Sequence, residues 1–244
     1  MDDVFGTAAR DYFMTKNKNL VIETRSSLGD EDEIPVYYLF RSRSEMPPLE
    51  VKALEVLKGA VLEIGCGVGS HLLELNSSHS FGIDSSLLSI EIAKRRGVQN
   101  VSVSTWQEYV SEKKFDSILL LMNGLCLAGS LNKLPSFLLH LSKWLLPGGS
   151  IIADSSDINY LFEEEDDGGV WMPATAYYGD LAYSISYQKS QSHFDWLFVS
   201  FEELLKVCVT LGFKCEKIFE GENNHFTARI GQAQSRNTAV ITKC

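Results

Sequence analysis

The segment from Val61 to Ser70 constrains the fold more than any other part of the chain. It reads Val-Leu-Glu-Ile-Gly-Cys-Gly-Val-Gly-Ser, so a short apolar strand runs directly into three glycines spaced two apart. Glycine permits a tight turn and lets backbone amides approach a ligand closely. We expect a helix to follow, and the pattern predicts a ligand site at Gly65, Gly67 and Gly69.

Strand and helix patterns alternate on either side of this loop. Further strands are predicted at 81–83, 101–103, 115–122 and 150–153, with helices starting near Leu49, after Asp84 and over 134–146. Such alternation indicates a parallel sheet, and the unbroken apolar run 115–122 indicates that helices cover both sheet faces.

The C-terminal part has a different pattern. Residues 178–188 and 193–199 alternate as an antiparallel hairpin, a helix starts at Ser200 and ends near Gly212, and two strands follow at 213–219 and 226–230. We therefore predict an α/β fold with a doubly wound, seven-stranded, mostly parallel sheet and a final antiparallel strand. Residues 1–48 form an N-terminal cap, and 49–244 form the main domain with an insertion at about 160–199.

Composition excludes several classes of protein. The formal net charge is −10, which disfavours nucleic acid as a partner. No apolar run is long enough for a membrane helix, and no signal peptide is expected. The five cysteines include no C-x-x-C pair, so we expect reduced thiols in a cytoplasmic protein, with neither a disulfide framework nor a metal site.

The glycine loop resembles motif I of the class I S-adenosylmethionine-dependent methyltransferases. Asp84, which ends the next strand 19 residues beyond Gly65, matches the acid that binds the ribose in that family. Phe115-Asp116 and Leu145-Leu146-Pro147-Gly148-Gly149 match two further family motifs in order and spacing. A dinucleotide site is the alternative, but its G-x-G-x-x-G pattern would require glycine at Ser70.

The resemblance implies S-adenosylmethionine as cofactor and S-adenosylhomocysteine as product. It places Met122 and Asn123 beside the transferring methyl, and Thr105 and Trp106 beside the adenine. Arg41 is a candidate partner for the methionine carboxylate, and His71 a candidate cofactor contact. The full set of predicted cofactor-binding residues is Arg41, Glu63, Gly65, Cys66, Gly67, Gly69, His71, Asp84, Ser85, Thr105, Trp106, Met122 and Asn123.

The methyl acceptor is less constrained by the sequence. The exit of the fourth strand reads Leu121-Met122-Asn123-Gly124 and lacks the motifs of nucleic-acid methyltransferases, which favours a small-molecule acceptor. A protein or RNA acceptor and a non-enzymatic binding protein are the alternatives. An oxygen or nitrogen acceptor must lose a proton, and His193, Asp154 and Asp157 are candidates for the general base, with no motif that selects among them.

Overall fold

A computed structural model describes residues 2–162 and 177–232 of the chain, so part of the predicted insertion lies outside the described residues. Seven strands form one large sheet in the order β10-β11-β7-β6-β3-β4-β5. Neighbouring strands from β7 to β5 are parallel, and β11 is antiparallel to both β7 and β10, which confirms the predicted fold class. The strand bounds are β3 Val61–Ile64, β4 Ser80–Asp84, β5 Val101–Val103, β6 Phe115–Leu120, β7 Leu145–Ser156, β10 Phe213–Glu220 and β11 His225–Gln232.

Helices cover both faces of this sheet, as the apolar runs predict. On one face, Leu62 and Ile118 pack against α4 (Leu134–Ser142) and α5 (Phe201–Thr210). On the other face, Val61 and Leu119 pack against α2 (Pro48–Glu55). Successive strand residues point to opposite faces, so β3 and β6 are buried on both sides. Helix α3 (Leu87–Arg95) follows β4 and packs beside the glycine loop.

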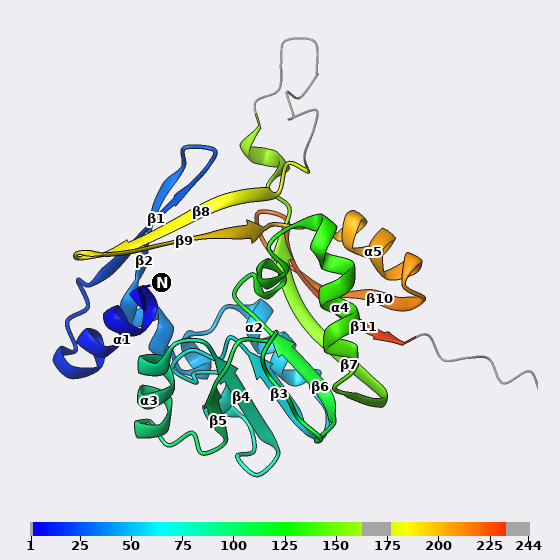
Figure 1. Cartoon of the computed structure of the whole chain (residues 1–244), viewed down its shortest axis with the longest axis horizontal. Coiled ribbons are helices and arrows are strands. Elements are labelled where there is room, and N and C mark those ends of the chain that lie inside the picture. Colours follow the sequence, from blue (N-terminus) through cyan, green and yellow to red (C-terminus); the bar gives the residue numbers. More distant parts are fainter. Residues whose placement is uncertain (1, 163–176, 233–244) are drawn as a thin grey trace, which may run out of the picture.

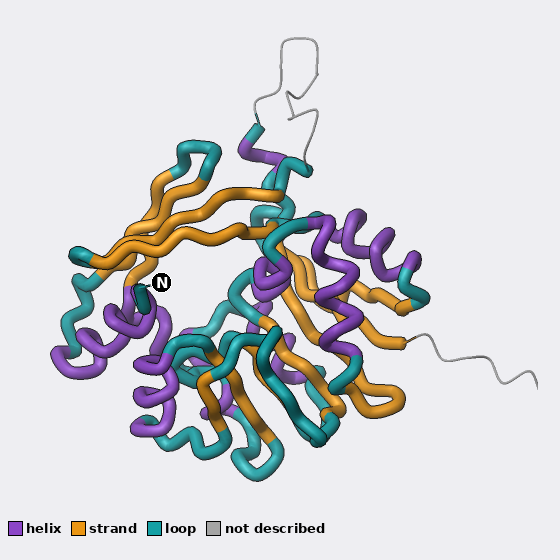
Figure 2. The backbone as a smooth tube through the Cα atoms, viewed as in Figure 1, coloured by secondary structure: helices purple, strands orange, loops and turns teal. Residues whose placement is uncertain are grey.

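A second sheet joins the N-terminal cap to the inserted hairpin. It has four antiparallel strands in the order β2-β1-β8-β9, where β1 is Val21–Ser26, β2 is Glu31–Pro35, β8 is Asp180–Tyr187 and β9 is Ser190–Leu197. Helix α1 (Val4–Thr15) packs on one face of it through residues that include Val4, Ala8 and Ile185. Figures 1 and 2 show this sheet beside the edge at which β3, β4 and β6 end.

Two local predictions were wrong. The glycine loop leads into a single 3-10 turn, Leu72–Glu74, and not into an α-helix, because the turn-forming segment Asn76–His79 follows at once. Helix α4 ends at Ser142, and Leu145 and Leu146 already belong to β7. The Pro147-Gly148-Gly149 turn lies within β7, where the pairing with β6 shifts register. No helix among the described residues is long and apolar enough to cross a membrane.

Candidate functional site

The three glycines of the loop have different surroundings. All have positive φ angles, 74° at Gly65, 51° at Gly67 and 80° at Gly69, which only glycine adopts without strain. A Cβ atom on Gly67 would meet nothing within 4 Å, whereas one on Gly69 would lie 2.7 Å from Val98. Gly67 therefore leaves open space above the backbone, whereas Gly65 faces the Leu127 side chain, which a Cβ atom would meet at 3.7 Å. Gly69 allows the loop to pack closely against its neighbours.

Asp84 holds this loop from the end of β4. Its Oδ2 accepts a hydrogen bond from the Gly67 amide, and its Oδ1 accepts one from the Ser86 amide, each at 2.8 Å. The residue is only partly buried, and each oxygen retains a lone pair for a further donor. Burial raises the pKa of the Asp84 carboxyl, and the two amides oppose that shift. Ser86, and not Asp84, caps α3 by accepting from the Ser89 amide.

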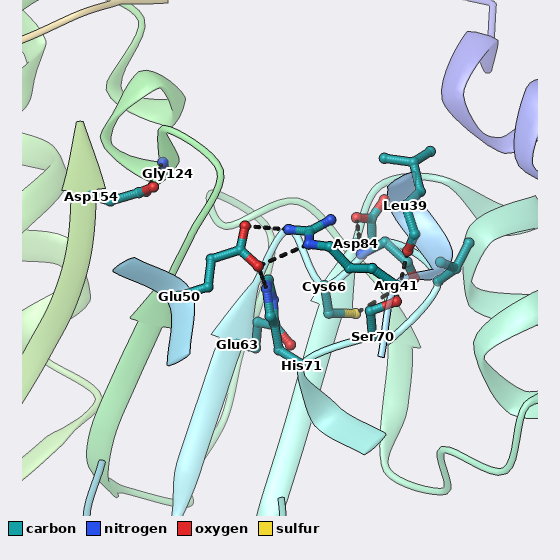
Figure 3. Close-up of polar contacts among 12 residues, drawn as sticks. Leu39, Arg41, Glu50, Glu63, Cys66, Ser70, His71, Asp84, Gly124 and Asp154 are labelled. Atoms are coloured by element: carbon teal, nitrogen blue, oxygen red, sulfur yellow. Dashed lines mark hydrogen bonds and ion pairs between the residues drawn. The ribbon is translucent and has the colours of Figure 1, made fainter. Parts of the chain in front are cut away.

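Four charged side chains form a buried chain beneath the loop (Figure 3). Arg41 forms a bidentate ion pair with Glu50, in which Arg41 Nε and Glu50 Oε2 are 2.9 Å apart. His71 lies between two carboxylates, with Nε2 3.1 Å from Glu50 and Nδ1 2.6 Å from Glu63. Their side chains are 3–8% exposed, so each charge depends on its neighbours for compensation.

The protonation of His71 follows from this position. Burial by itself would lower the pKa of His71, but the carboxylates of Glu63 and Glu50 outweigh burial and raise it to about 9. His71 is therefore a cation at neutral pH, and the two cations and two carboxylates of the chain balance.

One oxygen of this network has no partner. Glu63 Oε2 is buried and accepts no hydrogen bond within the part of the chain that the structure describes. An unpaired buried carboxylate oxygen is costly, and a cationic or amino group would satisfy it. Together with the open space over Gly67 and the free lone pairs of Asp84, this oxygen fits a ligand that carries hydroxyl and ammonium groups.

A second polar group lies where β6 and β7 end. Met122 and Asn123 both have positive φ angles, 66° and 59°, which is uncommon for residues other than glycine and often marks a functional constraint. Asn123 Oδ1 accepts a hydrogen bond from the Ser156 hydroxyl at 2.9 Å. The Gly124 amide donates to Asp154 Oδ1 at 2.8 Å, and Asp154 Oδ2 lies 3.1 Å from His225 Nε2.

The other predicted cofactor residues have mixed surroundings. Trp106 packs edge-on against Phe137 with ring centroids 4.9 Å apart, and the Thr105 hydroxyl bonds to Glu108. Because both side chains are engaged, we expect any contact with adenine to be made by the backbone groups of these two residues. Cys66 is buried, and burial raises the pKa of its thiol. Ser85 is exposed. Arg41 already has a carboxylate partner in Glu50, which weighs against a direct role in binding the methionine carboxylate.

The three candidates for the general base also differ. His193 is exposed on β9, and Asp154 is fully buried with both oxygens engaged. Asp157 accepts a hydrogen bond from the Tyr178 hydroxyl at 2.6 Å. Neither aspartate is therefore a free carboxylate.

Sequence reasoning missed Glu50, Arg96 and His225. Glu50 lies among the apolar residues of α2, a position that usually indicates packing. Arg96 follows two basic residues at the end of α3, where a basic side chain is typical, but its guanidinium donates to the Val68 carbonyl at 2.8 Å and supports the glycine loop. His225 follows Asn224 at the start of β11, and no motif surrounds it. Only the tertiary contacts reveal these three.

Comparisons with known proteins identify the family. No protein-family model and no curated protein matches the chain, whereas solved structures match most of it. A SAM-dependent methyltransferase from Bacteroides fragilis, crystallised with S-adenosyl-L-homocysteine, is 38% identical, with a TM-score of 0.86 and 95% of each chain covered. A SAM-dependent methyltransferase from Clostridium acetobutylicum is 13% identical, with a TM-score of 0.58, and 78% of this chain and 94% of that chain are covered.

The sugar N-methyltransferase KedS8 from Streptoalloteichus is 17% identical, with a TM-score of 0.52, and 76% of this chain and 85% of that chain are covered. The two more distant proteins share the fold alone, whereas the Bacteroides protein shares sequence over nearly its whole length. The chain therefore belongs to the family of S-adenosylmethionine-dependent methyltransferases, enzymes whose methyl donor is S-adenosylmethionine and whose product is S-adenosylhomocysteine.

Proposed function

We propose that this enzyme transfers the methyl group to a small-molecule acceptor. The observation that carries the proposal is the second sheet, which is attached to the main domain on both sides of the glycine loop. We call the second sheet the cover. A cover fixed on both sides favours a small acceptor, which can be enclosed beneath it, and disfavours a folded protein or an RNA helix, which cannot.

One attachment lies at the start of α3. Asp3, which caps α1, accepts a hydrogen bond from the Ser86 hydroxyl at 2.8 Å. Ser86 is two residues beyond Asp84, so the N-terminal cap contacts the segment that holds the glycine loop.

The other attachment lies beyond β6. The Leu131 amide donates to Asp180 of β8 at 2.7 Å, and Lys133 pairs with Asp195 of β9 at 3.1 Å. Leu197 and Val199, at the end of the hairpin, belong to the main hydrophobic core. The two attachments lie on opposite sides of β3, because the large sheet has the order β6-β3-β4.

Charge supports the same acceptor class. The net charge is −10, and exposed carboxylates of the second sheet include Glu23, Glu31, Asp32 and Glu33. An acidic cover repels the phosphates of RNA, so we expect no nucleic-acid partner. We also infer a cytoplasmic location, to which the free cysteines among the described residues, Cys66, Cys126, Cys208 and Cys215, are suited.

The site residues are assigned to the methyl donor as part of this proposal. Gly65 and Gly67 supply the loop backbone, with open space at Gly67, Asp84 accepts the ribose hydroxyls, and Glu63 Oε2 accepts the amino group. His71, itself held by Glu50 and Arg41, orients Glu63 and compensates its charge. The bound donor supplies a methyl group already activated on a sulfonium, so the protein mainly aligns donor and acceptor.

A transfer assay with radiolabelled S-adenosylmethionine tests the proposal. Amino sugars, phenols and small amines form one arm, and total RNA and denatured protein form the other. We expect label to move only into the small-molecule arm. Label that appears only in RNA or protein would overturn the small-molecule acceptor.

A further inference from the structure

A histidine and a buried aspartate lie side by side at the ends of β7 and β11. His225 is paired with Ser156 across the two antiparallel strands, and Thr227 is paired with Asp154, so all four side chains lie on one face of the sheet. His225 Nε2 and Asp154 Oδ2 are 3.1 Å apart. The Asp154 side chain is 1% exposed, whereas that of His225 is 33% exposed.

The pairing determines which nitrogen of His225 carries the proton. An ionised carboxylate only accepts hydrogen bonds, so Nε2 holds the hydrogen and Nδ1 of the neutral ring has a free lone pair. No described residue bonds to Nδ1. His225 is thus a partly exposed base with an orienting carboxylate behind it.

The same aspartate fixes the loop beside the transferring methyl. Its other oxygen accepts from the Gly124 amide at 2.8 Å, and Gly124 follows the two left-handed residues Met122 and Asn123. Asn123 is bonded to Ser156, the residue opposite His225. Three hydrogen bonds therefore tie His225 and the loop to Asp154 and Ser156, two residues apart on one face of β7.

None of the other four histidines is shown to combine a partly exposed ring with a single orienting carboxylate. His71 is buried between two carboxylates, and His140 packs edge-on against Trp144 with ring centroids 5.0 Å apart. His79 precedes β4, at the opposite end of that strand from Asp84. His193 is exposed, and no side-chain carboxylate is bonded to it among the described residues.

We propose that His225, oriented by Asp154, accepts the proton of the methyl acceptor, which rests on the proposed transfer to a small molecule. The attacking oxygen or nitrogen forms a bond to the methyl carbon while the carbon–sulfur bond breaks and its electron pair stays on sulfur. The proton of that oxygen or nitrogen passes to Nδ1 of His225. The resulting imidazolium is stabilised by the Asp154 carboxylate and later releases the proton to water.

This role defines the chemical class of the acceptor. A hydroxyl or a protonated amine must lose a proton during transfer, whereas a thiolate needs no base. His225 is then the catalytic base, Asp154 is a positioning residue, and the acceptor carries its proton on oxygen or nitrogen.

The test compares acceptors that differ in their need for a base. The probes are catechol, glucosamine and thiophenol, the last being already ionised at pH 8. His225→Gln should lower kcat for catechol or glucosamine by about 100-fold or more, the range typical of general-base loss. Transfer to thiophenol and the affinity for S-adenosylhomocysteine should stay within about twofold, as expected if the donor site is intact. His79→Gln, at the far end of β4, is the matched control and should match wild type throughout.

Asp154→Asn tests the positioning role. Its amide oxygen can still accept from Gly124, but its NH2 group would donate to Nε2 and transfer the ring hydrogen to Nδ1. Nitrogen-15 spectra of the labelled enzyme should show this change of tautomer at His225, together with the same selective loss of kcat.

Three results would overturn the proposal. They are an unchanged rate in His225→Gln, an equal loss with all three probes, and an Asp154→Asn variant with full kcat. The two proposals fail separately. Transfer to RNA or protein that disappears in His225→Gln would refute the small-molecule acceptor and leave His225 as the base.

Discussion

The large sheet and the second sheet are built on different principles. Among the described residues, the main core beside the large sheet contains 22 buried residues, whereas the core beneath the second sheet contains 6, namely Val4, Ala8, Ile22, Val36, Ile185 and Tyr187. The second sheet also joins distant segments, as in the hydrogen bond from Ala182 to Ser27, 155 residues apart. A small core closed by long-range pairing opens at lower free energy than a large one.

The difference suggests a division of labour. The proposed donor site lies at the end of the parallel sheet, where Asp84 bonds to the glycine loop and the buried ion pairs lie beneath it. The cover is held by a smaller core and by a few attachments at its two ends. If the proposed sites are right, we expect the donor site to keep its shape while the second sheet opens to admit an acceptor. Four predictions test this contrast, in order of decreasing expected effect.

The largest effect is expected at Gly67. A valine there would place a branched side chain in the open space above the loop and hold a residue other than glycine at a φ of 51°. We expect affinity for S-adenosylhomocysteine, measured by calorimetry, to fall by more than about 100-fold, which corresponds to roughly 2.7 kcal/mol. Gly212→Val introduces similar strain, at a φ of 71° after α5, and should bind normally. Normal binding by Gly67→Val would show that the loop does not hold the donor.

Two isoleucine truncations compare the regions directly. Ile185 in the second sheet and Ile151 in the large sheet are 4% and 1% exposed, and removal of such a side chain costs about 2–5 kcal/mol. Ile185→Ala should speed hydrogen exchange in β1 and β8, raise the KM of the acceptor and leave donor affinity nearly unchanged. Ile151→Ala should lower the melting temperature of the whole protein. Equal global unfolding in both variants would contradict the proposed division.

The buried ion pairs predict a pH dependence of stability. The pKa of His71 is raised from 6.5 to about 9 in the folded protein. A raised histidine pKa stabilises the fold fully below pH 6.5, and the contribution is lost as pH rises through 9. At 1.36 kcal/mol per pKa unit, this contribution is at most about 3 kcal/mol. Denaturant unfolding at pH 6, 7.5 and 9.5 should show the decline in wild type and in His79→Gln but not in His71→Gln. An unchanged slope in His71→Gln would place the titrating group elsewhere.

The smallest effect is expected at Asp84. Alanine removes the acceptor of the Gly67 and Ser86 amides and of the proposed ribose hydroxyls, so affinity for S-adenosylhomocysteine should fall at least about tenfold. The melting temperature should fall by a few degrees, because the loop loses two hydrogen bonds to a charged group. Asp116→Ala loses a comparable 2.8 Å bond to the Ala60 amide and should lower stability alone. If both variants bind alike, Asp84 serves only the loop.

The sequence by itself predicted the large sheet and the glycine loop in detail. Continuous apolar strands, the three glycines and Asp84 are local signals, because burial on both sheet faces and positive φ angles restrict residue types at single positions. The family, the fold class and the methyl donor followed from them and are confirmed. The cofactor-binding residues and the division of the chain at residue 48 stay predictions.

Only the tertiary structure decided the rest. Three of its features join residues from separate elements. They are the pairing of β1 with β8, the compensation of the His71 charge by Glu50 and Glu63, and the hydrogen bond between Asp154 and His225. A long-range contact produces no local sequence pattern, because each of the two residues would also be an ordinary surface or core residue at its own position. Local sequence determines which elements form and which backbone angles are possible, whereas the packing of those elements determines which charges meet.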